Sequence, residues 1–160
     1  MTQSPQRERS KVVVYVTCER HLLVLRQPAF PDVGLQPPGG TIEASESAHH
    51  AALREVKEET GLDLSPRELR LLGDRPYEFE SGGLRHRHWR HFFHAPIVAD
   101  IAQRWTTFEE TPDGGGAPIE FELFWRPLAE PIEFHAELDA FLAELRKRLH
   151  MAPVDPIGGA

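Results

Sequence analysis

The sequence predicts a single domain of the α+β or α/β class, and three observations support this prediction. The chain has 160 residues, of which 40% are hydrophobic, which is enough to bury one core. Runs of β-branched and aliphatic residues lie before and after a helix-forming segment that ends at Gly61. A second segment with helical spacing closes the chain, so strands and helices are expected to pack in layers.

The first two strands are expected at Lys11–Thr17 and Leu22–Arg26, where valine and leucine runs flank the short polar segment CERH. Because β-branched residues favour strands and the link is short, the two strands should form a hairpin in the core. Residues 1–10 and 151–160 lack periodicity, so we expect them to be flexible tails of a domain that spans residues 11–150.

A helix dense in carboxylates should follow a loop that ends at Gly39-Gly40. Ser45 is the expected N-cap, and Gly61 is expected to end the helix. Three carboxylates fall within about 100° of one another on one helix face: Glu55, Glu58 and Glu59. Because such like-charge pairs destabilise an isolated helix by about 0.2–0.5 kcal/mol each, we expect a cation nearby. Carboxylates together with phosphate oxygens are ligands that Mg²⁺ or Mn²⁺ prefers.

The rest of the chain alternates between strand patterns and turns. The predicted elements are strands at Leu69–Phe79, Leu84–Val98, Trp105–Phe108 and Ile119–Arg126, and a helix at about His135–His150. The first of these strands should be interrupted near Asp74–Pro76, because proline cannot donate a ladder hydrogen bond. The histidines of the second strand do not indicate zinc, because no cysteine or suitably placed carboxylate completes a site.

The helix and its approach also follow a fixed spacing pattern. The pattern reads Gly40, five residues, Glu46, seven residues, Arg54-Glu55, Val56, Lys57, Glu58-Glu59, Thr60, Gly61 and Leu62. With seven fixed residue types at about one in fifteen each, a chance match arises on the order of once in 10⁸ starting points. The pattern resembles the Nudix box of the Nudix hydrolase family. Many members have glycine where this chain has Ser45, but that position is variable.

This resemblance implies a fold, a reaction and a set of site residues. The implied fold is an α/β/α sandwich with a mixed β-sheet, and the implied reaction is hydrolysis of a diphosphate bond in a nucleoside diphosphate linked to another group. The implied ligands of Mg²⁺, or of Mn²⁺, are Glu58 and Glu59, Glu55 as a further ligand or water-orienting group, and the carbonyl of Gly39. The implied catalytic residues are Glu55, Glu58 and Arg54, with Glu46 as a partner of Arg54.

Further site residues are expected outside the motif. Arg26, Arg87 and Trp89 are candidates for substrate binding, because arginine neutralises phosphates and tryptophan stacks on bases. A solvent-facing surface role explains each of them equally well. Nudix hydrolases often recruit one more glutamate from the later strands, and the candidates are Glu109, Glu110, Glu120 and Glu122. We favour Glu120 as the additional catalytic acid, although each of the four is explained more simply as a solvent-facing residue.

The composition limits the partners and the compartment. A formal net charge of −7 argues against general nucleic-acid binding, which needs a basic footprint. The single cysteine, Cys18, excludes an intramolecular disulfide and should be a buried thiol. No signal peptide and no membrane-spanning apolar run is found, so a cytoplasmic protein without a membrane partner is expected. Homodimer formation is left open.

The identity of the substrate is also left open by the sequence. The expected partner is a small nucleotide-type diphosphate, such as a nucleotide, a nucleotide sugar, ADP-ribose or a dinucleoside polyphosphate. Pro76 and Tyr77 lie roughly where a proline marks ADP-ribose enzymes and a tyrosine marks dinucleoside-polyphosphate enzymes, so these cues conflict. The alternative function is a non-catalytic Nudix domain that acts as a nucleotide sensor or partner module. The presence of all three helix glutamates favours the enzyme over that alternative and over a scaffold with an acidic helix.

Overall fold

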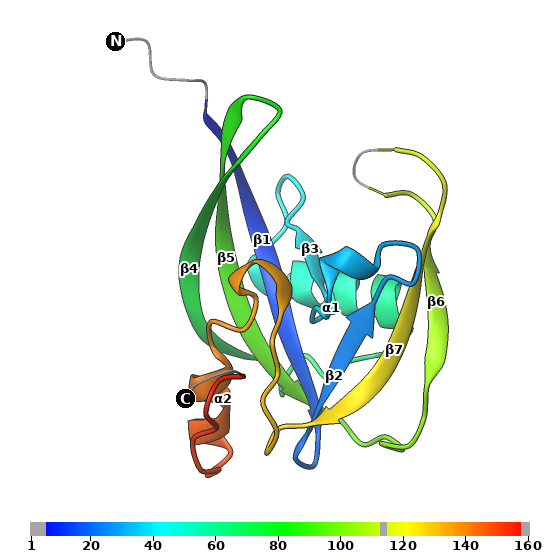
Figure 1. Cartoon of the computed structure of the whole chain (residues 1–160), viewed down its shortest axis with the longest axis vertical. Helices are drawn as coiled ribbons and strands as arrows, with labels where there is room; N and C mark the ends of the chain where they lie inside the picture. Colours follow the sequence, from blue (N-terminus) through cyan, green and yellow to red (C-terminus); the bar gives the residue numbers. More distant parts are fainter. Residues whose placement is uncertain (1–5, 113–114, 158–160) are drawn as a thin grey trace.

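The computed structural model describes residues 6–112 and 115–157, which form one mixed β-sheet with helices on both faces (Figure 1). The strands are β1 (Gln6–Cys18), β2 (His21–Arg26), β3 (Gly39–Thr41), β4 (Arg70–Ser81), β5 (Leu84–Pro96), β6 (Trp105–Glu109) and β7 (Ile119–Pro127). Their order across the sheet is β4-β5-β1-β2-β7-β6, and β3 pairs with β1. The β1–β5 pair is parallel, and the other pairs are antiparallel.

Each face of the sheet is covered by its own layer. Helix α1 (Ala48–Thr60) packs on one face, against Val12, Val14 and Val16 of β1. The other face, which carries Tyr15 of β1, is covered by the segment after β7, including the short helix α2 (Leu142–Arg148) (Figure 1). Because successive side chains of β1 point to opposite faces of the sheet, this strand contributes residues to both hydrophobic cores. The predicted sandwich with a mixed sheet and the predicted first hairpin are both confirmed.

The start of β1 corrects the prediction of a flexible tail over residues 1–10. Residues 6–10 continue β1 and pair in parallel with residues 85–89 of β5. Their side chains are exposed, so the segment carries no hydrophobic periodicity that could reveal a strand. Backbone pairing with β5 orders it instead. Residues 1–5 lie outside the described part of the chain.

Strand β4 runs without the interruption predicted near Asp74–Pro76. Pro76 lies opposite Trp89 in a continuous register, and the irregularity in pairing falls earlier, between Leu71 and Gly73. Proline is tolerated here because β4 is an edge strand, where a missing N–H donor leaves no ladder position unfilled.

The predicted helix over residues 135–150 is only half correct. A short turn, η2 (His135–Glu137), is followed by α2, and Ala136 within this turn has a positive φ of 53°, which a right-handed helix does not allow. We call residues 128–148, which follow β7 and include α2, the strap. Long-range hydrogen bonds hold it in place: the His135 N–H donates to the Leu35 carbonyl, and the Arg90 side chain donates to the Ala136 carbonyl. No helix in the described residues is both long and apolar enough to cross a membrane.

Candidate active site

Helix α1 is fixed at both of its ends. Ser47 caps the N-terminus by accepting a hydrogen bond from the His50 N–H at 3.0 Å, so the predicted cap at Ser45 is wrong by two residues. Ser45 instead occupies a turn with a positive φ of 66°. At the other end Gly61 adopts the left-handed conformation and donates to the Lys57 carbonyl, as predicted.

Strand β6 clamps the last turn of α1 against the sheet. The Trp105 indole N–H donates to the Thr60 carbonyl at 2.9 Å, and the Thr107 hydroxyl donates to the Glu59 carbonyl. These two bonds satisfy carbonyls that the end of a helix otherwise leaves without partners. They also fix the rotation of the helix, so that its glutamates face the loop before β3.

The two glycines of β3 allow the helix carboxylates to approach the sheet closely. The Gly39 N–H donates to Glu59 Oε1 at 2.8 Å. A Cβ atom at Gly40 would collide with the Glu55 carboxyl group, and one at Gly39 would collide with the Val12 carbonyl. The first glycine of the sequence motif is therefore required by the space that the Glu55 carboxyl group occupies.

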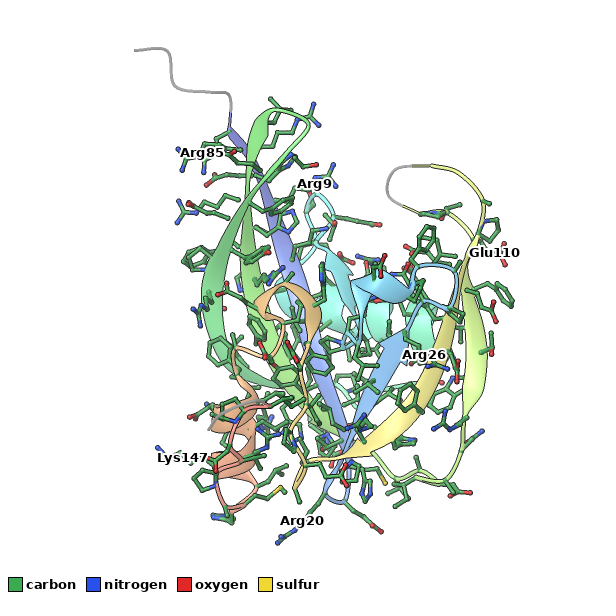
Figure 2. All side chains as sticks on the ribbon, viewed as in Figure 1. Arg9, Arg20, Arg26, Arg85, Glu110 and Lys147 are labelled. Carbon is green, nitrogen blue, oxygen red and sulfur yellow. The ribbon has the colours of Figure 1, made fainter. Side chains whose placement is uncertain are left out.

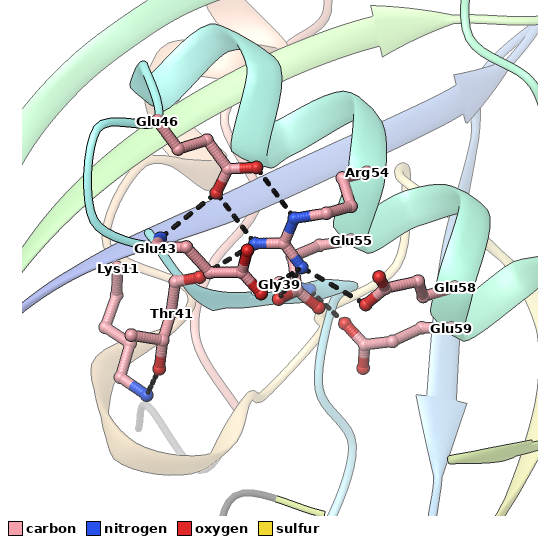
Figure 3. Close-up of polar contacts among 9 residues, drawn as sticks. All are labelled: Lys11, Gly39, Thr41, Glu43, Glu46, Arg54, Glu55, Glu58 and Glu59. Atoms are coloured by element: carbon pink, nitrogen blue, oxygen red, sulfur yellow. Dashed lines mark hydrogen bonds and ion pairs between the residues drawn. The ribbon is translucent and has the colours of Figure 1, made fainter. Parts of the chain in front are cut away.

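Arg54 lies at the centre of the polar network in Figure 3. Its Nε and Nη2 donate to the two carboxylate oxygens of Glu46 at 2.7 and 2.8 Å, which confirms the expected partnership. Its Nη1 donates to Glu55 at 2.9 Å and to Glu58 at 3.1 Å, while Nη2 also donates to the Thr41 carbonyl. The hydrogen bonds from Arg54 lower the pKa of the Glu46 carboxyl group to about 2.

The pKa values of Glu55 and Glu59 are shifted in the opposite direction from that of Glu46. Burial raises the pKa of Glu55 to about 7, against the opposing effect of Arg54. Burial also raises the pKa of Glu59 well above its usual range, and the neighbouring charges of Glu55, Glu109 and Glu58 add to this rise. Two acids that resist ionisation at neutral pH indicate a place where a positive charge would bind.

Both acids line an open pocket of about 450 Å³ next to β3. Glu109 at the end of β6 lines the same pocket, together with Gly39 and Gly40. Glu58 lies on the same side of α1 with a side chain that is 58% exposed. We call this site the acidic pocket. Glu109 was only one of four candidates in the sequence, and the pairing of β6 with β7 brings it here.

The structure does not bring Glu120, the favoured additional acid, to the acidic pocket. Ile119 and Phe121 of β7 line the pocket, so the residue between them points to the opposite face and is exposed. Glu109 pairs with Ile119 across the ladder and therefore shares its inward direction. Counting the alternation of β7 from its buried residues is the signal that could have distinguished the two glutamates.

The three predicted substrate-binding residues also lie outside the acidic pocket. Arg26 is paired with Glu122 at 2.8 Å on the surface of β2 and β7. Arg87 lies over the Trp89 ring at 5.6 Å, and its closest acidic partners are Glu8 at 3.7 Å and Glu78 at 3.9 Å. Arg87 and Trp89 share the face of β5 that carries Phe93 and is turned away from the strap.

A second pocket, of about 190 Å³, adjoins the acidic pocket and carries cations. It shares Gly39, Gly40 and Glu59 with the acidic pocket. Its other walls include Lys11, His88, Arg90 and, from the strap, Leu138. We call it the cationic pocket. It lies on the face of β5 opposite to Arg87 and Trp89.

The carboxylates suit a divalent cation in chemistry. Among the described residues, no three histidine, cysteine, aspartate or glutamate side chains form a ready metal-holding group. The reason is visible in Figure 3: Glu55 and Glu58 turn to Arg54, and Glu59 turns to the Gly39 N–H. Hard oxygen donors around an open pocket fit Mg²⁺ or Mn²⁺, and a bound cation would replace these contacts.

Comparison with known proteins identifies the family. The NUDIX domain family matches residues 7–149, and the chain belongs to this family. Over 96 residues the chain is 36% identical to dihydroneopterin triphosphate diphosphatase of Escherichia coli, covering 59% of each protein. Over 67 residues it is 45% identical to an m7GpppN-mRNA hydrolase of Danio rerio, covering 38% of this chain and 22% of that protein.

The fold has solved relatives of low sequence identity. The NUDIX domain of Shewanella oneidensis NrtR, solved with ADP ribose, superimposes with a TM-score of 0.61 at 15% identity. The match covers 89% of this chain and 88% of that one. At this identity the likeness establishes the shared fold.

Proposed function

We propose that this protein is a metal-dependent pyrophosphohydrolase that cleaves a diphosphate bond. The observation that carries the proposal is the pairing of the two pockets. Glu55 and Glu59 are buried acids that need a cation, and the adjoining pocket holds Lys11 and Arg90, which suit phosphate oxygens. A diphosphate that spans both pockets would meet a divalent ion at one end and fixed cations at the other.

The proposed metal ligands are Glu55, Glu58 and Glu59, with the Gly39 carbonyl as a further candidate. When bound, Mg²⁺ or Mn²⁺ neutralises phosphate charge and lowers the pKa of the attacking water. Glu109 is the proposed acceptor of the proton from that water, because its carboxylate lines the acidic pocket and comes from a separate element. Arg54 holds the helix glutamates in position through its hydrogen bonds.

The substrate is proposed to be a phosphorylated compound with an aromatic heterocycle. The relatives act on dihydroneopterin triphosphate and on m7GpppN-mRNA, and the solved neighbour binds ADP ribose. Each of these ligands joins a ring system to a chain of phosphates. The ring would lie beyond the phosphates, at the wall of the cationic pocket that carries Leu138 and the neutral imidazole of His88, whose pKa burial lowers to about 4.

The test is a hydrolysis screen with Mg²⁺ and with Mn²⁺. The compounds are nucleoside triphosphates, ADP-ribose, nucleotide sugars, dinucleoside polyphosphates and dihydroneopterin triphosphate, and the Glu59→Gln variant is the blank. Metal-dependent cleavage of one class, absent from the blank, is the expected result. Binding of metal and nucleotide without cleavage of any compound would replace the enzyme with a nucleotide sensor.

A further inference from the structure

Gln36 lies where the two pockets of the candidate active site meet. The cationic pocket and the acidic pocket are both lined by Gln36, and they also share Gly39, Gly40 and Glu59. We call the region lined by these four residues the junction. A ligand that occupies both pockets passes through the junction, so the polar groups there lie next to its path.

The backbone around Gln36 is held in place by hydrogen bonds. Gln36 and Leu25 exchange two of them, at 2.9 and 3.0 Å, beside the end of β2, where Figure 2 labels Arg26. Two residues later, the Pro38 carbonyl accepts a hydrogen bond from the Val14 N–H at 2.8 Å. The position of the Gln36 side chain at the junction is therefore set before any ligand binds, as a binding residue requires.

The Gln36 side chain lacks the hydrogen bond that a buried amide normally makes. Its amide nitrogen is buried, yet no group within residues 6–112 and 115–157 accepts a hydrogen bond from it. A buried N–H donor without a partner costs free energy, so this one points to an acceptor that the chain itself does not supply. Because the last torsion of a glutamine side chain is broad, the amide can turn its N–H groups into the junction when an acceptor binds there.

The surroundings of the amide indicate the class of acceptor. Arg90, whose exposed fraction is 7%, lines the cationic pocket on one side of the junction, and Glu59 belongs to the junction itself. An anionic oxygen is attracted by Arg90 and by a cation bound at Glu59. A cationic side chain at position 36 would instead pair with Glu59 and oppose the binding of a divalent ion. A neutral donor therefore suits a phosphate oxygen at this point.

We propose that Gln36 binds the diphosphate of the substrate at the junction by donating a hydrogen bond from its side-chain amide to a phosphate oxygen. This inference rests on the proposed function and adds to it a substrate-binding residue that lies outside the sequence motif. An amide does not accept the proton of the attacking water, so Gln36 takes part in binding and not in proton transfer. Its loss should weaken binding more than it slows turnover.

The direct test is the binding of inorganic pyrophosphate to the full chain at a fixed concentration of Mg²⁺. Gln36→Met keeps the length of the side chain but removes the amide, so it should raise the Kd for pyrophosphate about tenfold. Gln36→Glu removes the donor and adds a negative charge, so it should raise the Kd by about tenfold or more. Isothermal titration calorimetry measures these values for the wild type and both variants.

Thermal unfolding separates a binding role of Gln36 from a structural one. Gln36→Met removes a buried donor that makes no hydrogen bond within the described chain, so the melting temperature without ligand should not fall. Weaker binding together with unchanged stability is the signature of a group that serves a ligand. A fall in melting temperature of more than about 4 °C would show that the amide supports the fold, and it would overturn the inference.

Gln103 provides the matched control. It is an exposed glutamine in the link between β5 and β6, and it lines neither the cationic pocket nor the acidic pocket. Gln103→Met makes the same chemical change away from the junction and should leave the Kd for pyrophosphate unchanged. Gln36→Met should also leave the affinity for Mg²⁺ alone unchanged, because the amide is not proposed as a metal ligand. A similar rise in Kd for both methionine variants, or no rise for Gln36→Met, contradicts the inference.

Hydrolysis is measured separately, so that failure of the proposed function is distinguishable. For a compound that the wild type cleaves, Gln36→Met should raise KM about tenfold and change kcat less than about threefold. If the wild type cleaves no compound but binds pyrophosphate more tightly than Gln36→Met does, only the proposed hydrolysis fails. Absence of pyrophosphate binding by the wild type overturns the inference. So does a Gln36→Met variant that binds adenosine less tightly but pyrophosphate as before, because Gln36 would then contact the ring.

Discussion

Glu46 and Glu59 belong to one sequence motif, but their surroundings shift the pKa values of their carboxyl groups in opposite directions. Glu46 accepts two hydrogen bonds from Arg54, which lower the pKa of its carboxyl group to about 2. Glu59 is buried beside other acids and accepts the Gly39 N–H, and the pKa of its carboxyl group is raised. The charge of Glu46 is therefore balanced by Arg54 within the fold, whereas an ionised Glu59 would be stabilised by an added positive charge.

We therefore assign a structural role to Glu46, which precedes α1, and propose a ligand-binding role for Glu59, which lies on α1. Ionised Glu46 stabilises the folded state, because its cation is part of the same chain. Ionised Glu59 destabilises the folded state until a cation arrives, because desolvation and its acidic neighbours oppose the charge.

The largest expected effect is the loss of activity in the Glu59→Gln variant. Glutamine keeps the size of the side chain but removes the charge that a divalent cation requires, so turnover should fall by orders of magnitude. The melting temperature without metal should not fall, because an unfavourable buried charge is removed. Steady-state kinetics and thermal unfolding measure the two quantities. A variant that turns over like the wild type would end the assignment of Glu59 as a ligand.

The second prediction compares Glu109 with Glu120. Glu109→Gln should lower kcat about 10²-fold or more, because the proposed proton acceptor is lost. Glu120→Gln should change kcat less than twofold, because that side chain lies on the exposed face of β7. Parallel kcat measurements on the two variants decide between them, and the reverse ranking would restore Glu120 as the catalytic acid.

The third prediction concerns the ion pair between Glu46 and Arg54. Glu46→Gln should destabilise the fold by about 1.5–2 kcal/mol, because charge-assisted hydrogen bonds to Arg54 are weakened while Arg54 keeps Glu55 and Glu58 as partners. The side chains of Arg54 and Glu46 are 19% and 10% exposed, so solvent screens the pair only weakly. Urea unfolding at pH 7 measures the change in the free energy of unfolding. A loss below about 1 kcal/mol would place the pair among ordinary surface ion pairs.

Much of the helix and its motif could be predicted from the sequence, because the determinants are local. Spacing along α1 places the glutamates on one side, and a glycine at its end fixes the C-cap. The start of β1 and the strap were missed for the opposite reason. Residues 6–10 are ordered by pairing with β5, and the positive φ of Ala136 is held by contacts with distant residues.

In the candidate active site, too, local sequence predicts less where the arrangement depends on distant residues. The sequence placed Glu55 and Glu59 together, but it could not select the acid that a separate strand brings to them. That choice depends on which face of β7 is buried and on the register with β6, both of which are long-range properties. The same kind of choice arises on β5, where Arg87 and Trp89 lie on one face and the neighbouring residues His88 and Arg90 lie on the other and line the cationic pocket.

The fourth prediction concerns metal binding by the wild type and by the two glutamine variants. Mg²⁺ or Mn²⁺ should raise the melting temperature of the wild type, because a ligand that binds only the folded state stabilises it by about 2.7 kcal/mol at 100 times its Kd. Addition of EDTA should reverse the shift. Glu59→Gln should lose the shift, whereas Glu46→Gln should keep it despite a lower starting stability. Differential scanning fluorimetry of the three proteins with and without metal provides the comparison.

The smallest expected effect is a difference in acid stability between the wild type and Glu46→Gln. The pKa of Glu46 is lower in the folded state, about 2, than its ordinary value of 4.5, so the folded state binds this proton less readily than the unfolded state. Its stabilisation is therefore fully present above pH 4.5 and is lost as the pH falls toward 2. The difference in the free energy of unfolding between the two proteins should shrink over this range. Urea unfolding at pH 7, 5, 4 and 3 measures it, and a difference independent of pH would show that the loss in Glu46→Gln comes from packing and not from charge.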